Sequence, residues 1–217
     1  MKKLLCPSMM CANFGDLSRE VRELENAGAD IFHMDVMDGS FVPNFGMGLQ
    51  DIAYICKHAT IPCDVHLMIR NPDRYVELFA GLGAKIIYIH PEADGQAAQT
   101  LRHIRDLGCR AGIAVNPETS FASVQDLLPL CDCVLVMSVS PGFAGQKYLD
   151  FVTDKFREFV SHSEAFGGYE VLIDGACSPE KVRLLSGMGV TGFILGTSAL
   201  FGKDRPYSEI LPELRAS

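Results

Sequence analysis

The chain has 217 residues, of which 48% are apolar and 21% are charged, and its formal net charge is −8. This length suits one larger domain or two small ones, and the composition excludes a disordered protein. The acidic balance argues against nucleic-acid binding, and no apolar run approaches the roughly 20 residues of a membrane span. We therefore expect neither a nucleic-acid nor a membrane partner.

Apolar strands and amphipathic helices alternate along the chain. A strand is expected at 4–10, and a helix over 16–27 follows it and ends at Gly28. A buried strand then begins at Asp30, and the order of helix, glycine and strand returns three more times. A glycine just after a helix is typical of a left-handed cap. The expected strands are 4–10, 30–36, 61–68, 85–90, 110–115, 132–137, 169–174 and 192–196, and the expected helices are 16–27, 72–82, 95–107 and 179–188.

The spacing of these elements predicts the fold class. Strand starts recur about every 25 residues, the repeat of a βα unit. Eight such units predict an α/β protein with a single (β/α)8 TIM barrel. The alternative is a doubly wound open sheet, which normally has a glycine-rich fingerprint after its first strand, whereas residues 7–10 are Pro-Ser-Met-Met. No linker or low-complexity segment divides the chain, so we expect one domain over 1–217.

Functional side chains of such a barrel lie at the carboxyl ends of its strands. His33 and Asp35 are two residues apart on one expected strand, so their side chains point to the same side. His66 and Asp174 stand at equivalent heights on two other strands. This His2Asp2 set suits Zn, Mn, Co or Fe better than Mg or Ca, and predicts one divalent metal ion per chain. The alternative is four unrelated polar residues that cap turns or lie hydrogen-bonded in the core.

A glycine-containing loop after the sixth strand predicts a phosphate site. Glycines let backbone amides turn inward around an anion, and barrels often bind phosphate with the loops near their last strands. Small residues also follow the seventh and eighth strands. The candidate phosphate-binding residues are Gly142, Phe143, Ala144, Gly145, Gln146, Gly175, Ala176, Gly196, Thr197 and Ser198. Ser8 and His66 are further candidates for contact with the substrate.

Two other groups of residues have an ordinary and a functional interpretation. Met37, Met68 and Met137 either fill the core or form an apolar rim that keeps water from the site. The eight cysteines include no Cys-x-x-Cys pair, and Cys131 and Cys133 either pack in the core or bind a metal. Pro7 interrupts the N-terminal apolar stretch before it could form a signal peptide, so we expect a cytoplasmic protein.

Together the motifs resemble the ribulose-phosphate 3-epimerase family over nearly the whole chain. The matching segments are Pro7-Ser8, His33–Gly39, Phe41–Asn44, Asp64–Met68, His90-Pro91-Glu92, Asn116-Pro117, Met137–Val139, Pro141–Phe143 and Ile173–Gly175. The resemblance implies an isomerase with a ribulose-phosphate-binding type of barrel, and a divalent metal on His33, Asp35, His66 and Asp174. It also implies that Asp35 and Asp174 are an acid–base pair that epimerises C3 of a small ketose phosphate through a metal-stabilised enediolate. We expect the protein to be a homo-oligomer.

Several positions depart from the pattern of the pentulose-phosphate enzymes. They are Met9-Met10-Cys11, Ala144, Ala176-Cys177 and Thr197-Ser198. Each is similar to the allulose-6-phosphate 3-epimerase branch of the family. The resemblance therefore implies conversion of D-allulose 6-phosphate to D-fructose 6-phosphate, with conversion of D-ribulose 5-phosphate to D-xylulose 5-phosphate as the alternative.

Two other classes of function compete for the same strand. Related phosphosugar decarboxylases have an Asp-x-Lys-x-x-Asp pattern there, whereas this chain has His33, Asp35 and Asp38. Without that Lys, no group is in place to protonate a carbanion after loss of CO2. A metal-bound phosphosugar-binding protein without activity would lack an acid or a base, and neither is missing here.

Overall fold

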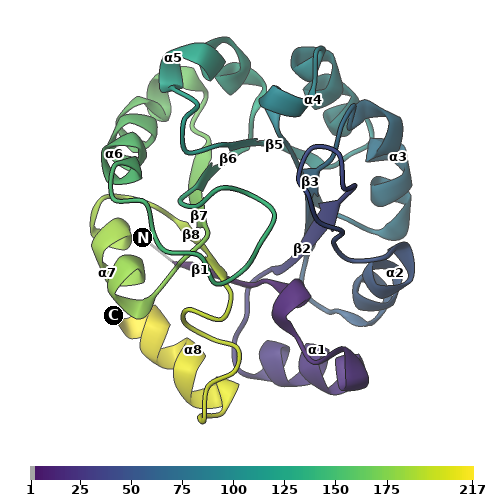
Figure 1. Cartoon of the computed structure of the whole chain (residues 1–217), viewed down its shortest axis with the longest axis vertical. Helices are drawn as coiled ribbons and strands as arrows, with labels where there is room; N and C mark the ends of the chain where they lie inside the picture. Colours follow the sequence, from purple (N-terminus) through teal and green to yellow (C-terminus); the bar gives the residue numbers. More distant parts are fainter. Residues whose placement is uncertain (1–2) are drawn as a thin grey trace.

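Eight parallel strands form one sheet whose order follows the chain (Figure 1). The computed structural model describes residues 3–217. The strands are β1 (Leu4–Pro7), β2 (Phe32–Met37), β3 (Cys63–Met68), β4 (Ile86–Ile89), β5 (Arg110–Val115), β6 (Cys133–Met137), β7 (Glu170–Asp174) and β8 (Gly192–Leu195). A parallel bridge between Ser8 and His33 joins the ends of the sheet, next to β1 and in β2. This architecture confirms the predicted (β/α)8 barrel.

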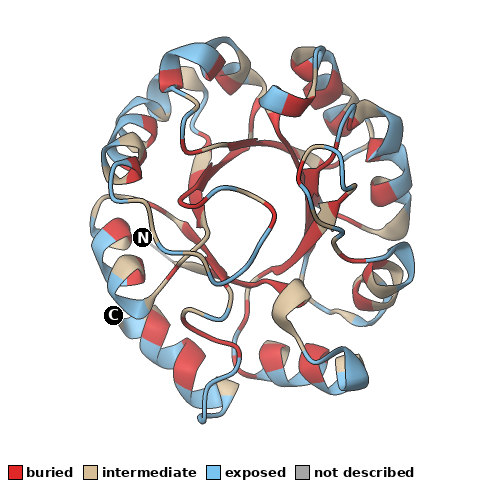
Figure 2. Ribbon diagram, viewed as in Figure 1, coloured by how far each residue is buried: buried red, intermediate tan, exposed pale blue. Residues whose placement is uncertain are grey.

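Helices surround the barrel and pack their apolar sides against it (Figure 2). The α-helices are α1 (Leu17–Asn26), α2 (Leu49–His58), α3 (Asp73–Leu82), α4 (Ala97–Asp106), α5 (Phe121–Val124), α6 (Val152–His162), α7 (Pro179–Gly187) and α8 (Tyr207–Ala216). The 3-10 helices are η1 (Met9–Cys11), η2 (Phe14–Asp16), η3 (Pro91–Ala93), η4 (Gln125–Leu130) and η5 (Glu164–Phe166). Gly83 ends α3 with a φ of 112°, the left-handed cap that the sequence predicts. Within residues 3–217, no helix is long and apolar enough to cross a membrane.

The first strand is shorter than expected. The prediction of a strand over 4–10 is wrong at its end, because β1 stops at Pro7 and Met9–Cys11 form a 3-10 turn. The Cys11 amide donates to the Ser8 carbonyl at 3.0 Å, which closes this turn. The chain leaves the sheet there, and the Ser8 hydroxyl reaches Asp35 of the neighbouring strand.

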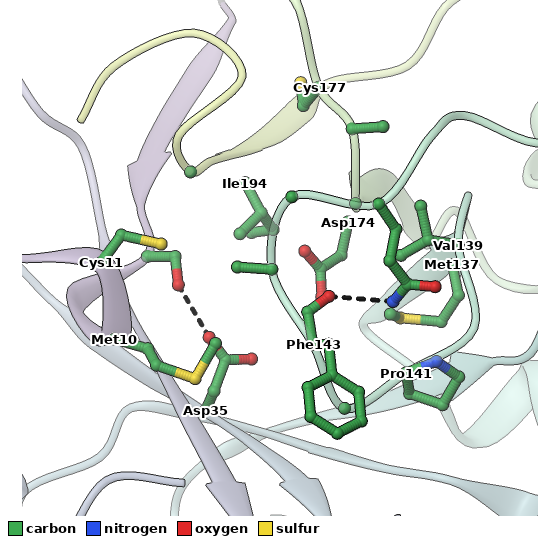
Figure 3. A pocket seen from close by; sticks show the side chains of 18 of the residues that line it. Met10, Cys11, Asp35, Met137, Val139, Pro141, Phe143, Asp174, Cys177 and Ile194 are labelled. Atoms are coloured by element: carbon green, nitrogen blue, oxygen red, sulfur yellow. Dashed lines mark hydrogen bonds between the residues drawn. The ribbon is translucent and has the colours of Figure 1, made fainter. Parts of the chain in front are cut away.

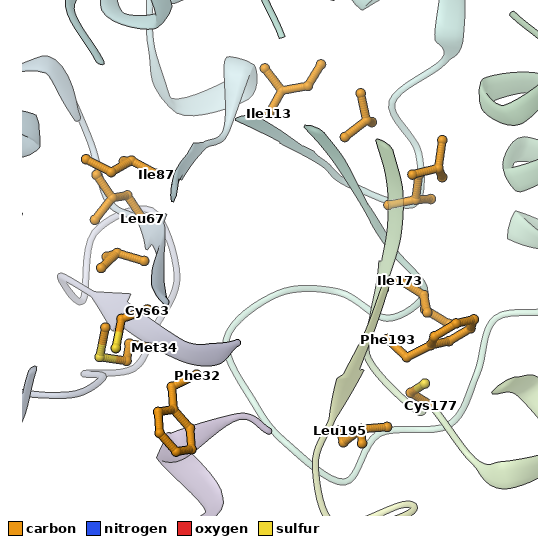
Figure 4. Close-up of a cluster of buried hydrophobic side chains, with 14 of the residues drawn as sticks. Phe32, Met34, Cys63, Leu67, Ile87, Ile113, Ile173, Cys177, Phe193 and Leu195 are labelled. Carbon is orange, nitrogen blue, oxygen red and sulfur yellow. The ribbon is translucent and has the colours of Figure 1, made fainter. Parts of the chain in front are cut away.

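Two apolar layers hold the barrel. The larger layer lies between the strands and the helices, and Figure 4 shows side chains of it from β2, β3, β5, β7 and β8. The smaller layer fills the barrel interior around the completely buried Tyr88. A Cβ on Gly112 would lie 2.4 Å from Tyr88 Cδ1, so this glycine makes room for the ring. Cys131 belongs to the outer layer and Cys133 to the inner one, which supports core packing for both.

Candidate active site

Four side chains from β2, β3 and β7 converge at the carboxyl ends of these strands. One ligand atom from each of His33, Asp35, His66 and Asp174 lies within 4.8 Å of the others. Alternation along β2 places His33 and Asp35 on one side, and the parallel register aligns Asp35 with His66 of β3. Both histidines are completely buried, and the Asp174 side chain is 16% exposed.

The spacing within this cluster fits a shared metal ion. His33 Nε2 and His66 Nδ1 each lie 3.4 Å from Asp35 Oδ1, and His66 Nδ1 lies 3.5 Å from Asp174 Oδ2. These distances exceed those of direct charge-assisted hydrogen bonds. Neither of these two ring nitrogens has a hydrogen-bond partner among residues 3–217. Two imidazole nitrogens and two carboxylates are a suitable donor set for a divalent transition metal.

A buried carboxylate orients the first histidine. Asp64 Oδ1 lies 2.6 Å from His33 Nδ1, and neither side chain is exposed to solvent. Burial raises the pKa of Asp64. Burial would lower the pKa of His33, but the carboxylates of Asp64 and Asp35 raise it well above its usual value. Asp64 therefore keeps the ring with Nε2 directed to the cluster.

A second histidine and a glutamate lie behind His66. His66 Nε2 is 2.8 Å from His90 Nε2, and His90 Nδ1 is 3.4 Å from Glu92 Oε2. Glu92 Oε1 accepts hydrogen bonds from the Asn116 amide, at 2.9 Å, and from the Thr119 hydroxyl. Burial lowers the pKa of His90 to about 4. Burial would raise the pKa of Glu92, but His90 and the two donors lower it to about 2.

The two carboxylates of the cluster face one pocket from different strands, as Figure 3 shows. The Ser8 hydroxyl donates to Asp35 Oδ2 at 2.7 Å. Burial would raise the pKa of Asp35, but His33 and His66 lower it. The Ser138 hydroxyl instead donates to the main-chain carbonyls of Asp174, at 3.2 Å, and Gly175. Ser8 thus contacts a carboxylate, whereas Ser138 holds the backbone that carries the other one.

Nearly all of the other candidate site residues line this pocket. They are Ser8, Met37, Met68, Met137, Gly142, Phe143, Ala144, Gly145, Gln146, Gly175, Ala176, Gly196, Thr197 and Ser198. His33 and His66 do not line it, and both side chains are completely buried. Further lining residues that were not among the candidates are Met10, Cys11, Val139, Ser140, Pro141, Cys177 and Ile194.

The loop after β6 reaches over the barrel opening (Figure 1). Gln146 Nε2 donates to the carbonyls of Ser140, at 2.6 Å, and Phe143, at 2.9 Å, which fixes the curve of the loop. The Asn44 side chain donates to the Gly142 carbonyl at 2.7 Å and ties this loop to the one after β2. Ala176, in the loop after β7, has a φ of 43°, so it adopts the left-handed conformation although it is not a glycine.

The three methionines are buried as well as facing the pocket. Met37 and Met68 form a small cluster with Val42, against which Met10 and Phe41 pack. Met137 is 2% exposed. Their burial fits core packing, and their position at the pocket wall fits an apolar rim.

A family model described as "Ribulose-phosphate 3 epimerase family" matches residues 4–201. The chain belongs to the ribulose-phosphate 3-epimerase family. This membership confirms the resemblance found in the sequence and makes the protein an isomerase of the epimerase class.

Curated relatives align with this chain over nearly their whole length. A ribulose-phosphate 3-epimerase of Bacillus subtilis (strain 168) is 35% identical over 215 residues, which cover 98% of each chain. Ribulose-phosphate 3-epimerase 1 of Cupriavidus necator is 40% identical over 219 residues, covering 97% of this chain and 90% of that protein. Ribulose-phosphate 3-epimerase of Escherichia coli (strain K12) is 36% identical over 216 residues, covering 98% of this chain and 95% of that protein.

Solved structures share the fold with this member of the epimerase family. A 3-keto-L-gulonate-6-phosphate decarboxylase from Vibrio cholerae superposes with a TM-score of 0.74 at 17% identity, covering 100% of this chain and 97% of that chain. A 3-hexulose-6-phosphate synthase superposes with a TM-score of 0.72 at 14% identity, covering 100% of this chain and 99% of that chain. At these identities the likeness shows the barrel fold alone.

Sequence reasoning assigned no role to three residues that lie next to the histidines of the cluster or support them. Asp64, His90 and Glu92 entered only as parts of motifs. For Asp64 the sequence did contain a signal. Asp64 and His66 are two residues apart, so the carboxylate lies on the same side of the strand as a candidate metal ligand. Glu92 offered no comparable signal, because its partners Asn116 and Thr119 come from the loop after β5.

Proposed function

We propose that this protein epimerises C3 of a phosphorylated 2-ketose, with D-allulose 6-phosphate as its preferred substrate and D-fructose 6-phosphate as the product. The observation that carries the proposal is the pair Asp35 and Asp174, which face one pocket from β2 and β7. Inversion at a carbon needs a base on one side of it and an acid on the other. Two carboxylates on different strands can meet that need.

Asp35 and Asp174 transfer the proton in this proposal. One carboxylate removes the C3 proton from one side of the substrate, and the other donates a proton to the opposite side. The Ser8 hydroxyl holds Asp35 Oδ2, so that carboxylate has one fixed orientation. The backbone contacts of Ser138 position Asp174 in a comparable way.

The four residues of the cluster would hold one Zn, Mn, Co or Fe ion. Bound there, the ion supplies a Lewis acid that stabilises the negative charge which deprotonation of a ketose creates. His33 and His66 would hold that ion, and neither of them lines the pocket. Met37, Met68 and Met137 limit the access of water to the reacting end.

The loops after β6, β7 and β8 would bind the phosphate. A protein with a net charge of −8 attracts an anion through local donors and not through its overall field. Gly142 and Gly145 have φ values of 116° and 80°, which turn the backbone so that amides can face an anion. His66, the other candidate for contact with the substrate, is completely buried and is not among the residues that line the pocket, so we propose that it would serve by holding the metal ion.

The preference for a hexulose phosphate rests on where the sequence departs from the pentulose pattern. Met10, Cys11, Ala144, Cys177 and Thr197 all line the pocket of the two carboxylates. Departures concentrated in one pocket are expected when the substrate differs. D-Ribulose 5-phosphate is the second candidate, which the names of the curated relatives favour.

A comparison of kcat/KM between the two phosphates on one metal-loaded preparation tests the proposal. We expect the larger value for D-allulose 6-phosphate. A larger value for D-ribulose 5-phosphate would overturn the substrate preference and keep the C3 chemistry. Turnover of neither compound would overturn the proposed reaction.

We also propose that residues 1–217 form one domain, that the protein is cytoplasmic and that it is a homo-oligomer. Light scattering of the purified protein tests the last point. A particle mass equal to one chain of 23.7 kDa would contradict it.

A further inference from the structure

The Nε2 atoms of the buried rings of His66 and His90 face each other, and only one of them can carry a proton. Their Nε2 atoms are 2.8 Å apart, and neither ring is exposed to solvent. Two ring nitrogens at this distance form a hydrogen bond only if one carries a proton and the other is bare. The ring planes meet at 30°, and their centroids are 5.0 Å apart. Which ring donates therefore decides the tautomer of both histidines.

Glu92 decides the direction of this hydrogen bond. Its Oε1 is occupied by two donors, the Asn116 amide and the Thr119 hydroxyl, which leaves Oε2 for His90 Nδ1. The 3.4 Å between Glu92 Oε2 and His90 Nδ1 is an electrostatic contact and not a hydrogen bond, and the negative charge favours the proton of His90 on Nδ1, the nitrogen that faces it. The neutral ring then has a bare Nε2, which accepts the proton of His66 Nε2.

When the His66 ring is neutral, this direction leaves its Nδ1 bare. That atom faces Asp35 Oδ1 and Asp174 Oδ2 at 3.4 and 3.5 Å. A metal binds only the nitrogen without a proton. In the opposite direction, a proton on His66 Nδ1 would occupy the place of the metal.

We propose that Glu92 and His90 are positioning residues that select the tautomer of His66 in which Nδ1 can bind a metal ion. The inference rests on the proposed metal cluster. On the other side of that cluster, Asp64 alone plays the corresponding part for His33. Its carboxylate contacts His33 Nδ1 directly, at 2.6 Å. A purely structural alternative is that His90 only fills space beneath Phe41, whose ring centroid lies 4.9 Å from that of His90.

Glu92→Gln separates the two possibilities with little change in shape. The Asn116 amide and the Thr119 hydroxyl both donate, so the oxygen of the substituted side chain must stay with them. The NH2 group of that side chain then faces His90 Nδ1 and donates to it. This reverses the pair, so that His90 donates to His66 and the proton of His66 moves to Nδ1.

Zinc affinity measured by competition with a chelator is the first readout. Loss of a residue that orients a metal-binding histidine typically weakens metal affinity by about 10–100-fold, and we expect a loss in that range for Glu92→Gln. Asp94→Asn is the matched control, because Asp94 lies in the same segment but bonds Gln96 and Thr100 and not the histidines. We expect the control to bind zinc as the wild type does.

The tautomer of His66 is the second readout, and a space-filling role would not change it. Burial would lower the pKa of His66, but Asp174 and Asp35 raise it. The tautomer is therefore measured by ¹⁵N NMR on the metal-free protein at alkaline pH, where the ring is neutral. We expect the proton on Nε2 in the wild type and on Nδ1 in Glu92→Gln. His90→Gln retains an acceptor for His66 and should bind zinc better than His90→Leu, which has none.

Each outcome supports or overturns the inference. Equal zinc affinity and an unchanged His66 tautomer in Glu92→Gln would overturn it while the metal cluster stands. No zinc binding by the wild type would overturn the cluster itself, and the inference with it.

Discussion

Gly46 lies where the loop after β2 folds back against its own strand. The Met47 amide donates to the Asp35 carbonyl at 2.9 Å, so this loop contacts the backbone of a residue of the cluster. A Cβ on Gly46 would lie 2.4 Å from that carbonyl oxygen and 2.9 Å from the Met37 amide nitrogen. Both atoms belong to a strand held on each side, so they cannot move away easily.

Gly46→Ala should therefore displace Asp35 and destabilise the protein. We expect the free energy of unfolding to fall by about 1–3 kcal/mol, the usual range for an overpacked core, together with a loss of kcat. Chemical denaturation and steady-state kinetics measure the two effects. Gly81→Ala in α3 is the control, because its added Cβ has no atom within 4 Å and a helix favours Ala over Gly. Equal stability of the two variants would contradict the crowding at Gly46.

Hydrogen bonds join the loops at the barrel mouth to one another. Asp38 accepts from the amides of Ser40 and Phe41 within its own loop, and from the Arg70 amide in the loop after β3. Asn44 in the same loop holds the Gly142 carbonyl. The loop after β6 is therefore bonded to the loop after β2, which is itself bonded to the loop after β3, and these contacts support the proposed phosphate site.

Gly145→Val should raise KM for the phosphorylated substrate. No atom lies within 4 Å of a Cβ at this position, but its φ is 80°, so the cost is conformational. A left-handed residue with a side chain costs about 1–2 kcal/mol, and a β-branched one more, so the loop should leave this shape. A free energy of about 1.4 kcal/mol corresponds to a tenfold change in binding, and we expect KM to rise by at least about that factor.

Gly167→Val is the matched control for Gly145. Gly167 has a φ of 107° and equally open surroundings, but it lies before β7, at the other end of the barrel. We expect it to lose stability with an unchanged KM. A similar KM in both variants would remove Gly145 from the phosphate site.

At the scale of the molecule, the barrel interior is divided into an apolar and a polar part. The apolar part surrounds Tyr88, and the polar cluster begins at His33, whose ring centroid lies 6.4 Å from that of Tyr88. Buried charges are costly unless they are paired or bind a metal. Here each buried carboxylate lies beside an imidazole ring, Asp64 at His33 and Asp35 at His66.

The local pattern of the sequence predicted the features that depend on neighbours in the chain. Alternation on one strand placed His33 and Asp35 together, and the position of Gly83 marked the end of α3. Features that depend on distant contacts were missed. The Ser8 hydroxyl bonds Asp35, a residue 27 positions away in the chain, and Glu92 is held beside His90 by Asn116 and Thr119.

Solvent exchange at C3 tests the two-carboxylate reaction most directly. The reaction is run in D2O with an unlabelled ketose phosphate and metal-loaded protein, and the hydrogen at C3 of the product is assigned by NMR. We expect one solvent deuterium at C3 of each product molecule, because the carboxylate that donates has exchanged its proton with solvent and is not the one that accepted. A product that keeps its original C3 hydrogen throughout would mean that a single base moves the same proton, and would contradict the assignment of Asp35 and Asp174.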